Sequence, residues 1–378
     1  MRLRIATFNV ENLVSRNVYG PKERPQIQAP LSLFDFADPE FRAAVQAATA
    51  VALEDDERQA TALAIAETRA DILCLQEVDS LGVLAPFLKH YVHAAGDLRY
   101  GHMRLVPGND PRGIDVAFCA RRGLVENEDA ITARSWSAAT YEELDVHSPE
   151  IAELGIAPDQ RVFNRDCLEV DVDLGDRGLT LFICHLKSTG YGPRSSSPAL
   201  RAAEARAVRA IVERRFGAGW REALWIVAGD FNDGPLRIRA DGGLVENEAW
   251  GGAALTEDFA IDPVRGLVET QRWTYHFRDV GEEGVVADEH VQLDHVLLSP
   301  ALAAANPAPS VEIIRRGLPY RVPLDPAHPD RSIGYLSTRN DRYPRIGWDR
   351  PRASDHCPLV VEIDVPKIPL SPVPKEGS

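Results

Sequence analysis

The sequence predicts an α/β fold in which packed β-sheets are covered by helices, and three observations lead to this class. Short apolar runs rich in Val, Ile, Leu and Phe recur from one end of the chain to the other, as is typical of strands. Two of these runs are joined by a tight turn signal, and others follow segments with helical spacing. Strands linked both by hairpins and by helices indicate packed sheets covered by helices.

Eight apolar runs are predicted to form strands. In chain order they span residues 3–8, 72–75, 114–118, 168–172, 179–184, 224–227, 296–298 and 358–363. The Gly-Asp-Arg-Gly turn at residues 175–178 predicts an antiparallel hairpin. Charged residues are interleaved with apolar ones at helical spacing over residues 54–69 and 198–216, so both segments are predicted to be helices.

The composition fits one globular domain. The chain has 378 residues, of which 44% are hydrophobic and 26% charged, and its sequence contains no internal repeat or long linker. We therefore expect a single domain over residues 1–366 and a Pro-rich tail over residues 367–378. Long loops are expected at residues 14–39, 137–166 and 315–353, where they are candidates for the walls of a substrate site.

Charge and cysteine content bear on partners and location. The net charge of −15 repels polyanions and argues against a strong grip on DNA. Phosphate chemistry stays open, because a bound divalent cation reverses the local charge. The sequence shows no secretory signal and no apolar run long enough to span a bilayer. Five scattered cysteines lie mostly in apolar runs, so we expect buried thiols and a cytoplasmic protein.

Polar side chains follow nearly every apolar run, and such residues would gather at one rim of the sheets. They fall in six segments, which contain Asn9 with Glu11, Glu77, His185 with Lys187 and Ser188, Asp230 with Asn232, Asp294, and Asp355 with His356. A hard cation such as Mg²⁺ prefers oxygen ligands and keeps several waters. One or two carboxylates plus an amide would therefore be enough to hold it.

Each of these residues also has a structural explanation. Asp230 and Asn232 could form an Asx turn after a strand. Asp294 and His295 could be a buried polar pair, and we expect His295 itself to be structural. Residues 354–356 could be a simple loop. The structural explanations would all have to hold together, and the order of the six segments favours chemistry instead.

In this order the six segments resemble the endonuclease/exonuclease/phosphatase superfamily, whose members are similar to deoxyribonuclease I. The resemblance runs from Asn9 to His356 and covers almost the whole chain. It implies a four-layer α/β sandwich of two packed mixed, largely antiparallel sheets flanked by helices. It also implies one catalytic domain that hydrolyses phosphoesters with Mg²⁺ or Mn²⁺.

The resemblance implies a metal site built from oxygen ligands. Glu77 would be the principal ligand, with Asn9 beside it and Asp355 on the same side. Glu11 matches a position where some relatives carry an acidic residue linked to the metal.

The resemblance also implies the acid–base residues. Asp230 and Asn232 would align and activate the attacking water, and Asn232 would grip the phosphate. His356 would contact a phosphate oxygen or donate a proton, while Asp294 would hydrogen-bond its ring and favour the protonated form. His185 matches the second histidine of the deoxyribonuclease and sphingomyelinase branches.

Substrate-binding residues are expected on the basic side of the rim. Arg112 opens a segment that resembles the family's central strand, which begins in several branches with a phosphate-contacting arginine, although a solvated arginine in a Pro-Gly-rich loop is the alternative. Lys187, Ser188 and Arg201 would extend this surface, and the role of Asp115 stays open. Arginines over residues 339–352 form either a nucleic-acid platform or an acid-balanced loop.

The leading hypothesis is therefore a nuclease-type phosphodiesterase that acts by in-line attack of water, with DNA and RNA among its candidate substrates. One alternative is a phosphodiesterase or phosphatase for a small or lipid phosphoester, similar to sphingomyelinases or inositol phosphatases. Another is a binding scaffold that has kept the fold and lost catalysis. We expect a monomer, and the sequence indicates no protein partner.

Overall fold

Two large β-sheets pack face to face in the computed structural model, which describes residues 1–14, 39–189, 197–239, 243–281, 284–319, 321–322, 335–336, 341–347 and 350–371. The six-stranded sheet has the order β14-β17-β1-β2-β4-β3, and the five-stranded sheet has the order β13-β8-β7-β6-β5. The pairs β1–β2 and β7–β8 are parallel, and the other described pairs in these two sheets are antiparallel. The predicted mixed, largely antiparallel sheets are confirmed.

The strands of the six-stranded sheet are β1 (Arg2–Leu13), β2 (Ile72–Val78), β3 (Tyr100–Leu105), β4 (Asp115–Arg121), β14 (Ser310–Ile313) and β17 (Leu359–Asp364). Those of the five-stranded sheet are β5 (Ile131–Ser135), β6 (Cys167–Asp173), β7 (Gly178–His185), β8 (Trp225–Asp230) and β13 (Asp294–Leu298). A smaller sheet, here called the four-stranded sheet, contains β9 (Leu236–Arg239), β10 (Leu244–Glu246), β11 (Tyr275–Gly281) and β12 (Gly284–Val291). A two-stranded pair joins β15 (Arg321–Val322) and β16 (Tyr335–Leu336).

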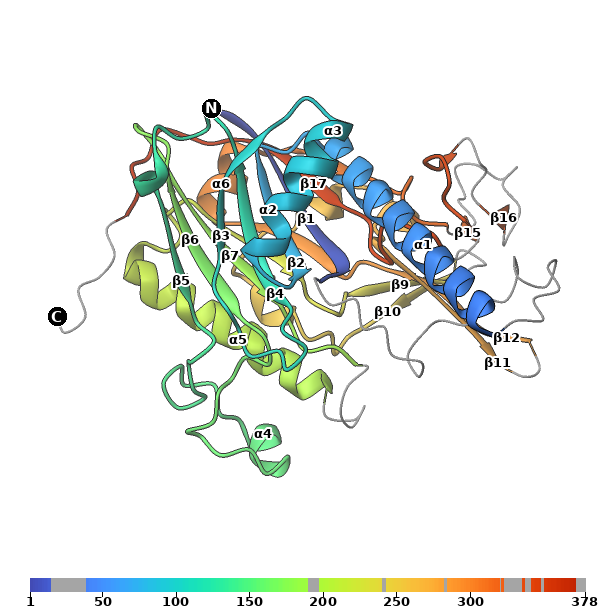
Figure 1. Cartoon of the computed structure of the whole chain (residues 1–378). Helices are drawn as coiled ribbons and strands as arrows, with labels where there is room; N and C mark the ends of the chain where they lie inside the picture. The colour runs from blue at the N-terminus through green and yellow to red at the C-terminus, as the bar shows by residue number, and fades with distance from the viewer. Residues whose placement is uncertain are drawn as a thin grey trace.

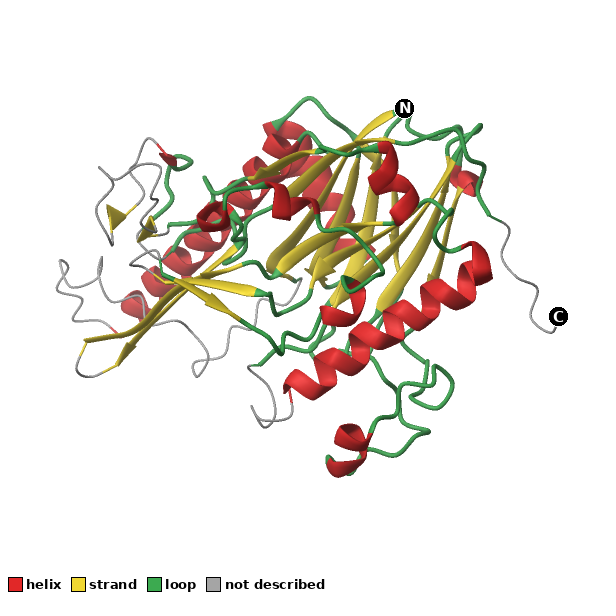
Figure 2. Cartoon of the chain, turned by 180° about the vertical axis from the view of Figure 1, so that it is seen from behind, coloured by secondary structure: helices red, strands yellow, loops and turns green. Residues whose placement is uncertain are grey.

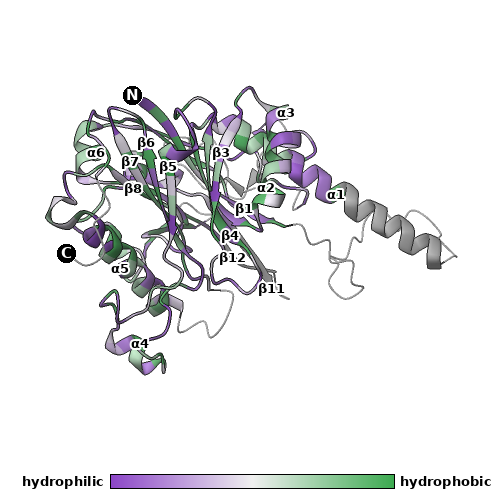
Figure 3. Ribbon diagram, turned by 60° about the vertical axis from the view of Figure 1, so that its left-hand side comes forward, coloured by the Kyte–Doolittle hydropathy of each residue, from purple (hydrophilic) through white to green (hydrophobic). Residues whose placement is uncertain are grey.

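Helices cover the outer faces of both large sheets, as Figure 1 shows. The helices are α1 (Pro39–Thr68), α2 (Leu81–Phe87), α3 (His93–Ala95), α4 (Pro149–Glu153), α5 (Ser197–Phe216) and α6 (Pro300–Ala305). Successive side chains of a strand point to opposite faces of its sheet, so each sheet packs against a different layer on each side. In β1, Ile5 faces the core between the sheets, whereas Ala6 faces the core shared with Ile65 of α1. The polar outer side of the C-terminal part of α1 and the mixed surface of α5 are visible in Figure 3. The predicted four-layer sandwich is confirmed.

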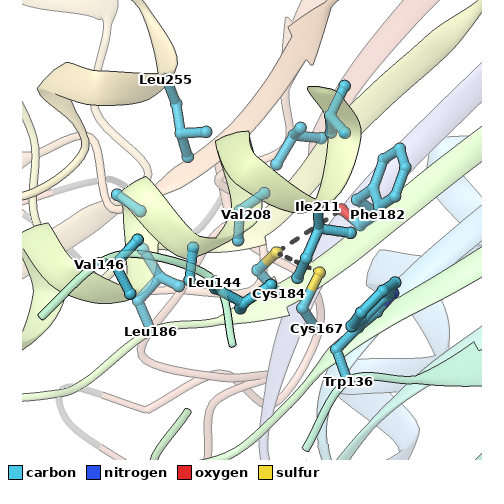
Figure 4. Packing of buried hydrophobic residues seen from close by; sticks show 14 of the residues in the cluster. Trp136, Leu144, Val146, Cys167, Phe182, Cys184, Leu186, Val208, Ile211 and Leu255 are labelled. Atoms are coloured by element: carbon cyan, nitrogen blue, oxygen red, sulfur yellow. Dashed lines mark hydrogen bonds between the residues drawn. The ribbon is translucent and has the colours of Figure 1, made fainter. Parts of the chain in front are cut away.

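The core between α5 and the five-stranded sheet contains two facing thiols. Cys184 Sγ lies 3.7 Å from Cys167 Sγ, beneath Ile211 of α5 (Figure 4). All five cysteines are free and buried, as predicted. The predicted loop at residues 137–166 also packs here, through Leu144 and Val146, and it contains α4. This loop therefore contributes to the core beside α5.

Other elements differ from the sequence-based expectation. Helix α1 begins at Pro39, well before the predicted start at residue 54. The four-stranded sheet extends away from the two large sheets (Figure 2) and was not predicted, because β9 and β10 are mostly exposed and lack an apolar run. The predicted loop at residues 14–39 lies almost entirely outside the described residues, as does much of residues 315–353. None of the described helices combines the length and apolar character needed to cross a bilayer.

Candidate active site

Strand register brings the polar residues together at one edge of the sandwich. The parallel pair β7–β8 places His185 opposite Asp230, and the antiparallel strand β13 places Asp294 opposite Asp230 as well. In the other sheet, the parallel pair β1–β2 places Asn9 opposite the residue before Glu77. Asn9 of β1 donates to Asp230 of β8 at 3.0 Å, so both sheets contribute to one site.

The backbone leaves regular strand geometry at this edge. The register of β1 against β2 shifts after Asn9, and that of β2 against β4 shifts before Val78. Glu11, Glu77 and Asn232 have φ values of 49°, 66° and 52°. Residues other than glycine rarely adopt this left-handed conformation, and such strain is concentrated at functional sites.

A cavity of about 620 Å³, here called the hollow, opens at this edge. The predicted site residues that line it are Asn9, Glu11, Glu77, Arg112, His185, Ser188, Arg201, Asp230, Asn232, Asp355 and His356. Asp294 lies behind His356 and is fully buried. Lys187 does not line the hollow, since its amine donates to the Ser188 carbonyl at 2.7 Å. The role of Lys187 in substrate binding stays a prediction.

Asp230 lies at the centre of the hydrogen-bond network. Its Oδ2 accepts hydrogen bonds from Asn9 Nδ2 at 3.0 Å and Asn232 Nδ2 at 3.2 Å, and its Oδ1 accepts from the Asn232 backbone N–H at 2.7 Å. Burial raises the pKa of Asp230, although the charge of His356 opposes this shift. The carboxyl group is therefore a stronger base than an exposed aspartate.

The two histidines have opposite electrostatic environments. His356 Nδ1 lies 2.8 Å from Asp294 Oδ2, and its Nε2 lies 3.8 Å from Asp230 Oδ2. Burial lowers the pKa of His356, but the charges of these two carboxylates outweigh it and raise the pKa well above its ordinary value. Burial, with the positive charges of Arg165 and His356, lowers the pKa of His185 well below its ordinary value. His185 is neutral, so its 3.4 Å approach to Asp230 is not an ion pair.

Asn9, Glu77 and Asp355 offer oxygen ligands that suit a hard divalent cation. Burial raises the pKa of Glu77, and the nearby charge of Asp355 adds to this shift while that of Arg112 opposes it. A cation would relieve this crowding of negative charge, so the donor set fits Mg²⁺ or Mn²⁺.

A second group of possible ligands contains Asp230, Asp294 and His356, whose ligand atoms lie within 4.8 Å of one another. Asp294 and His356 already hydrogen-bond each other at 2.8 Å. The described residues therefore offer two possible sets of ligands for a divalent cation at this edge.

Glu11, which is expected to be linked to a metal, forms ion pairs with two arginines. Its carboxylate accepts from Arg352 Nε at 2.9 Å and Arg352 Nη2 at 2.5 Å, and from Arg350 Nη2 at 2.5 Å. Arg350 also donates to Glu57 of α1 at 2.6 Å. These described arginines support the acid-balanced loop over a nucleic-acid platform, whereas Arg339 and Trp348 lie outside the described residues.

The arginines around the hollow are held by carboxylates. Arg112 pairs with Asp110, and Arg201 is buried against Asp233 at 3.2 Å. Asp115, whose role was open, accepts a hydrogen bond from the Gly108 N–H at 2.7 Å and so anchors a loop.

Several residues of the hollow were missed by sequence reasoning. They are Arg165, Arg237, Tyr275 and Glu289, among others. Arg165 lies just before β6, as Arg112 lies just before β4, so the strand-start position that singled out Arg112 could also have identified Arg165. Tyr275, Arg237 and Glu289 belong to the four-stranded sheet, which was not predicted. His295, expected to be structural, is buried and stacks on Phe231 outside the hollow.

A comparison with protein families decides the assignment. The model of the endonuclease/exonuclease/phosphatase family matches residues 6–356. The chain belongs to this family. Members of the endonuclease/exonuclease/phosphatase family are generally phosphoester hydrolases that use a divalent metal. The resemblance based on the six polar segments is thereby confirmed.

Solved structures of the family share low sequence identity with the chain. They include a family protein from Leptotrichia buccalis C-1013-b (13% identity, TM-score 0.49, covering 96% of this chain and 99% of that one) and the AP endonuclease LMAP from Leishmania major (15%, 0.48, 97% and 88%). TDP2 from D. rerio, complexed with a single-strand DNA product, is a third (14%, 0.46, 96% and 99%). No curated protein sequence matches the chain.

Proposed function

We propose that the protein is a divalent-metal-dependent phosphodiesterase, in which residues 1–366 form one catalytic domain and water attacks phosphorus in line with the leaving oxygen. The observation that carries the proposal is the meeting of three groups in one hollow. They are the oxygen ligands around Glu77, the buried carboxylate of Asp230 and the imidazolium of His356.

The residues of the hollow divide the work of the reaction. Asn9, Glu77 and Asp355 would hold Mg²⁺ or Mn²⁺, which when bound supplies positive charge to the phosphate oxygens. Asp230, with its raised pKa, accepts the proton of the attacking water. Asn232 aligns that carboxylate through its backbone N–H.

His356 donates a hydrogen bond to a phosphate oxygen or to the leaving oxygen, where negative charge develops. Asp294 fixes its tautomer from behind, through the 2.8 Å contact with Nδ1. The neutral ring of His185 supplies a further polar contact without adding a second positive charge next to His356.

Two substrate classes fit this chemistry. A nuclease-type activity on DNA or RNA is suggested by the resemblance of the six polar segments to deoxyribonuclease-like members of the family. A small or lipid phosphodiester is favoured by the net charge of −15, which disfavours polyanions. Raising NaCl from 50 to 300 mM separates the two: a steep loss of kcat/KM supports a polyanion, and near indifference supports a small substrate.

The direct test is hydrolysis by the purified, metal-stripped chain. Plasmid DNA, single-stranded RNA, bis-p-nitrophenyl phosphate and choline phospholipids are assayed with and without Mg²⁺ or Mn²⁺. We expect cleavage of at least one substrate only with metal, and loss of about 10²-fold or more in Glu77→Gln and His356→Ala. Glu213→Gln, at an exposed pair on α5, is the matched control. Metal-independent activity, or full activity in both site variants, would overturn the proposal.

A further inference from the structure

One carboxylate with a buried side chain, Asp110, binds two arginines that line the hollow and precede strands of different sheets. Arg112 donates to Asp110 through Nε at 3.1 Å and Nη2 at 3.0 Å, and Arg165 donates to Asp110 through Nε at 3.0 Å. The side chains of Asp110 and Arg165 are each 6% exposed, whereas that of Arg112 is 30% exposed. Asp110 and Arg112 precede β4 of the six-stranded sheet, and Arg165 precedes β6 of the five-stranded sheet.

Arg165 is fixed at the wall of the hollow. Its Nη1 donates to the Leu186 carbonyl at 2.8 Å, and its Nη2 donates to Ser188 Oγ at 3.3 Å. Each terminal nitrogen of a guanidinium carries two N–H donors. One donor at Nη1 and one at Nη2 are thus left over from the contacts with the described residues.

Both guanidinium charges act on the catalytic centre. After burial, Arg165 is the strongest influence that lowers the pKa of His185, and Arg112 is the strongest charge that lowers the pKa of Glu77. Burial of Asp110 opposes its ionisation, but hydrogen bonds and charge from the two arginines lower its pKa. Asp110 is therefore an anion, and together with its two arginines it carries a net charge of +1.

We propose that Asp110 is a positioning residue, which holds Arg112 and Arg165 together as a two-guanidinium clamp for the phosphate of a phosphodiester monoanion. This proposal rests on the proposed function and adds the phosphate-binding site to it. Two guanidiniums so close repel each other unless a carboxylate lies between them. Planar guanidinium forks match the oxygens of a phosphate, and a net charge of +1 balances the single charge of a phosphodiester.

A purely structural role of Asp110, which would only join the two segments, makes a different prediction. Asp110→Asn keeps the size of the side chain and removes its charge. We expect this variant to raise KM for bis-p-nitrophenyl phosphate about tenfold, with a smaller change in kcat. In an Arg112→Ala background the same change should raise KM less than threefold, because one arm of the clamp is already missing. An equal effect in both backgrounds would overturn the clamp.

Binding of inorganic phosphate tests the clamp without catalysis. Calorimetry on the full chain should show phosphate affinity about tenfold weaker in Asp110→Asn than in the wild type. Asp176→Asn removes a matched carboxylate from an exposed Asp–Arg pair with Arg177 and should leave the affinity unchanged. Unchanged phosphate affinity in Asp110→Asn would overturn the proposal.

A third variant protects the test against misfolding. Arg112→Lys keeps the charge and alters only a half-exposed side chain, and it should raise KM and weaken phosphate binding because an ammonium lacks the fork. If Asp110→Asn loses its near-UV circular dichroism, Arg112→Lys decides alone, and wild-type affinity there would overturn the clamp. A chain that binds phosphate through the clamp but hydrolyses no substrate would contradict the proposed function only.

Discussion

Asp294 is a buried residue that influences the protonation state of His356. It is fully buried and does not line the hollow, yet its Oδ2 contacts His356 Nδ1 at 2.8 Å. Its charge favours the imidazolium form of His356 over the neutral form. His356 therefore lines the hollow, whereas Asp294, which influences its charge, is buried behind it.

Asp294→Asn should lower kcat by about 10²-fold while the fold persists, because the amide keeps the shape of the side chain and loses its charge. Steady-state kinetics and circular dichroism check this expectation. Asp262→Asn is the matched control, since Asp262 is also buried beside a histidine, His295, at 3.6 Å and away from the hollow. Wild-type kcat in Asp294→Asn would show that His356 does not depend on this carboxylate.

Asp166 predicts a pH dependence of stability. Burial raises its pKa to about 7, although the Trp136 backbone N–H donates to it at 3.0 Å. An aspartate in the unfolded chain has a pKa of about 3.9. Between these values the folded protein binds a proton that the unfolded chain does not, so the free energy of unfolding falls as pH rises from about 4 to 7.

Asp166→Asn should remove this slope and be more stable than the wild type at pH 8, by up to about 4 kcal/mol. Urea unfolding at pH 4.5, 6 and 8 measures the free energy of unfolding for both proteins. Parallel pH profiles of the two proteins would contradict the assignment.

At the scale of elements, Glu11 joins the end of β1 to the segment that carries Asp355. Arg350 and Arg352 both donate to Glu11, and Thr61 of α1 donates to the Ala353 carbonyl at 2.5 Å. We expect these contacts to hold Asp355 in place, and we predict that Glu11 acts through this segment instead of binding the metal.

Glu11→Gln should therefore lower kcat about tenfold and change the Kd for Mn²⁺ less than threefold, as measured by kinetics and calorimetry. The double variant with Arg352→Ala should fall no further than either single variant. A loss of Mn²⁺ affinity as large as that of Glu77→Gln would make Glu11 a metal ligand after all.

Gly229 permits the close approach of β7 and β8 just before Asp230. A Cβ at this position would lie 1.9 Å from the Cys184 carbonyl oxygen. Gly229→Ala should lower the free energy of unfolding by about 3 kcal/mol and reduce activity, because the strands must move apart. Gly219→Ala, where nothing lies within 4 Å, is the control for thermal and urea unfolding. Equal stability of the two variants would contradict this account.

The sequence predicted the site residues that lie at the ends of apolar strands. Asn9, Glu77, His185 and Asp230 each lie at the end of an apolar run, and strand register aligns Asn9 with the residue before Glu77 in one sheet and His185 with Asp230 in the other. The partners of Glu11 could not be predicted, since they lie more than 300 positions along the chain. The four-stranded sheet was missed in part because β9 and β10 are short, mostly exposed and without an apolar run.

At the scale of the whole molecule, the site spans the interface between the two large sheets. Asn9 of β1 donates to Asp230 of β8 at 3.0 Å, and His356 contacts Asp294 of β13. We therefore expect activity to require that the two sheets keep their relative position. The secondary structure of each sheet can persist when that position changes.

In a urea titration, activity should disappear at a lower concentration than the far-UV circular dichroism signal, because a small shift between the sheets breaks both contacts. Enzyme assays at each urea concentration, with the same urea present in the assay, check this order. Coincident transitions would show that the sheets separate only when the chain unfolds.

We expect the four-stranded sheet to influence which substrates enter the hollow, because it lies outside the two sheets that carry the proposed catalytic residues. Tyr275, Arg237 and Glu289 line the hollow from this sheet, while Asp230 and Glu77 come from the two large sheets. Sequence change in β9 to β12 can thus reshape what enters the hollow and leave the hydrolytic residues in place. We therefore expect substitutions in this sheet, whether natural or engineered, to change which phosphoester substrates the protein accepts.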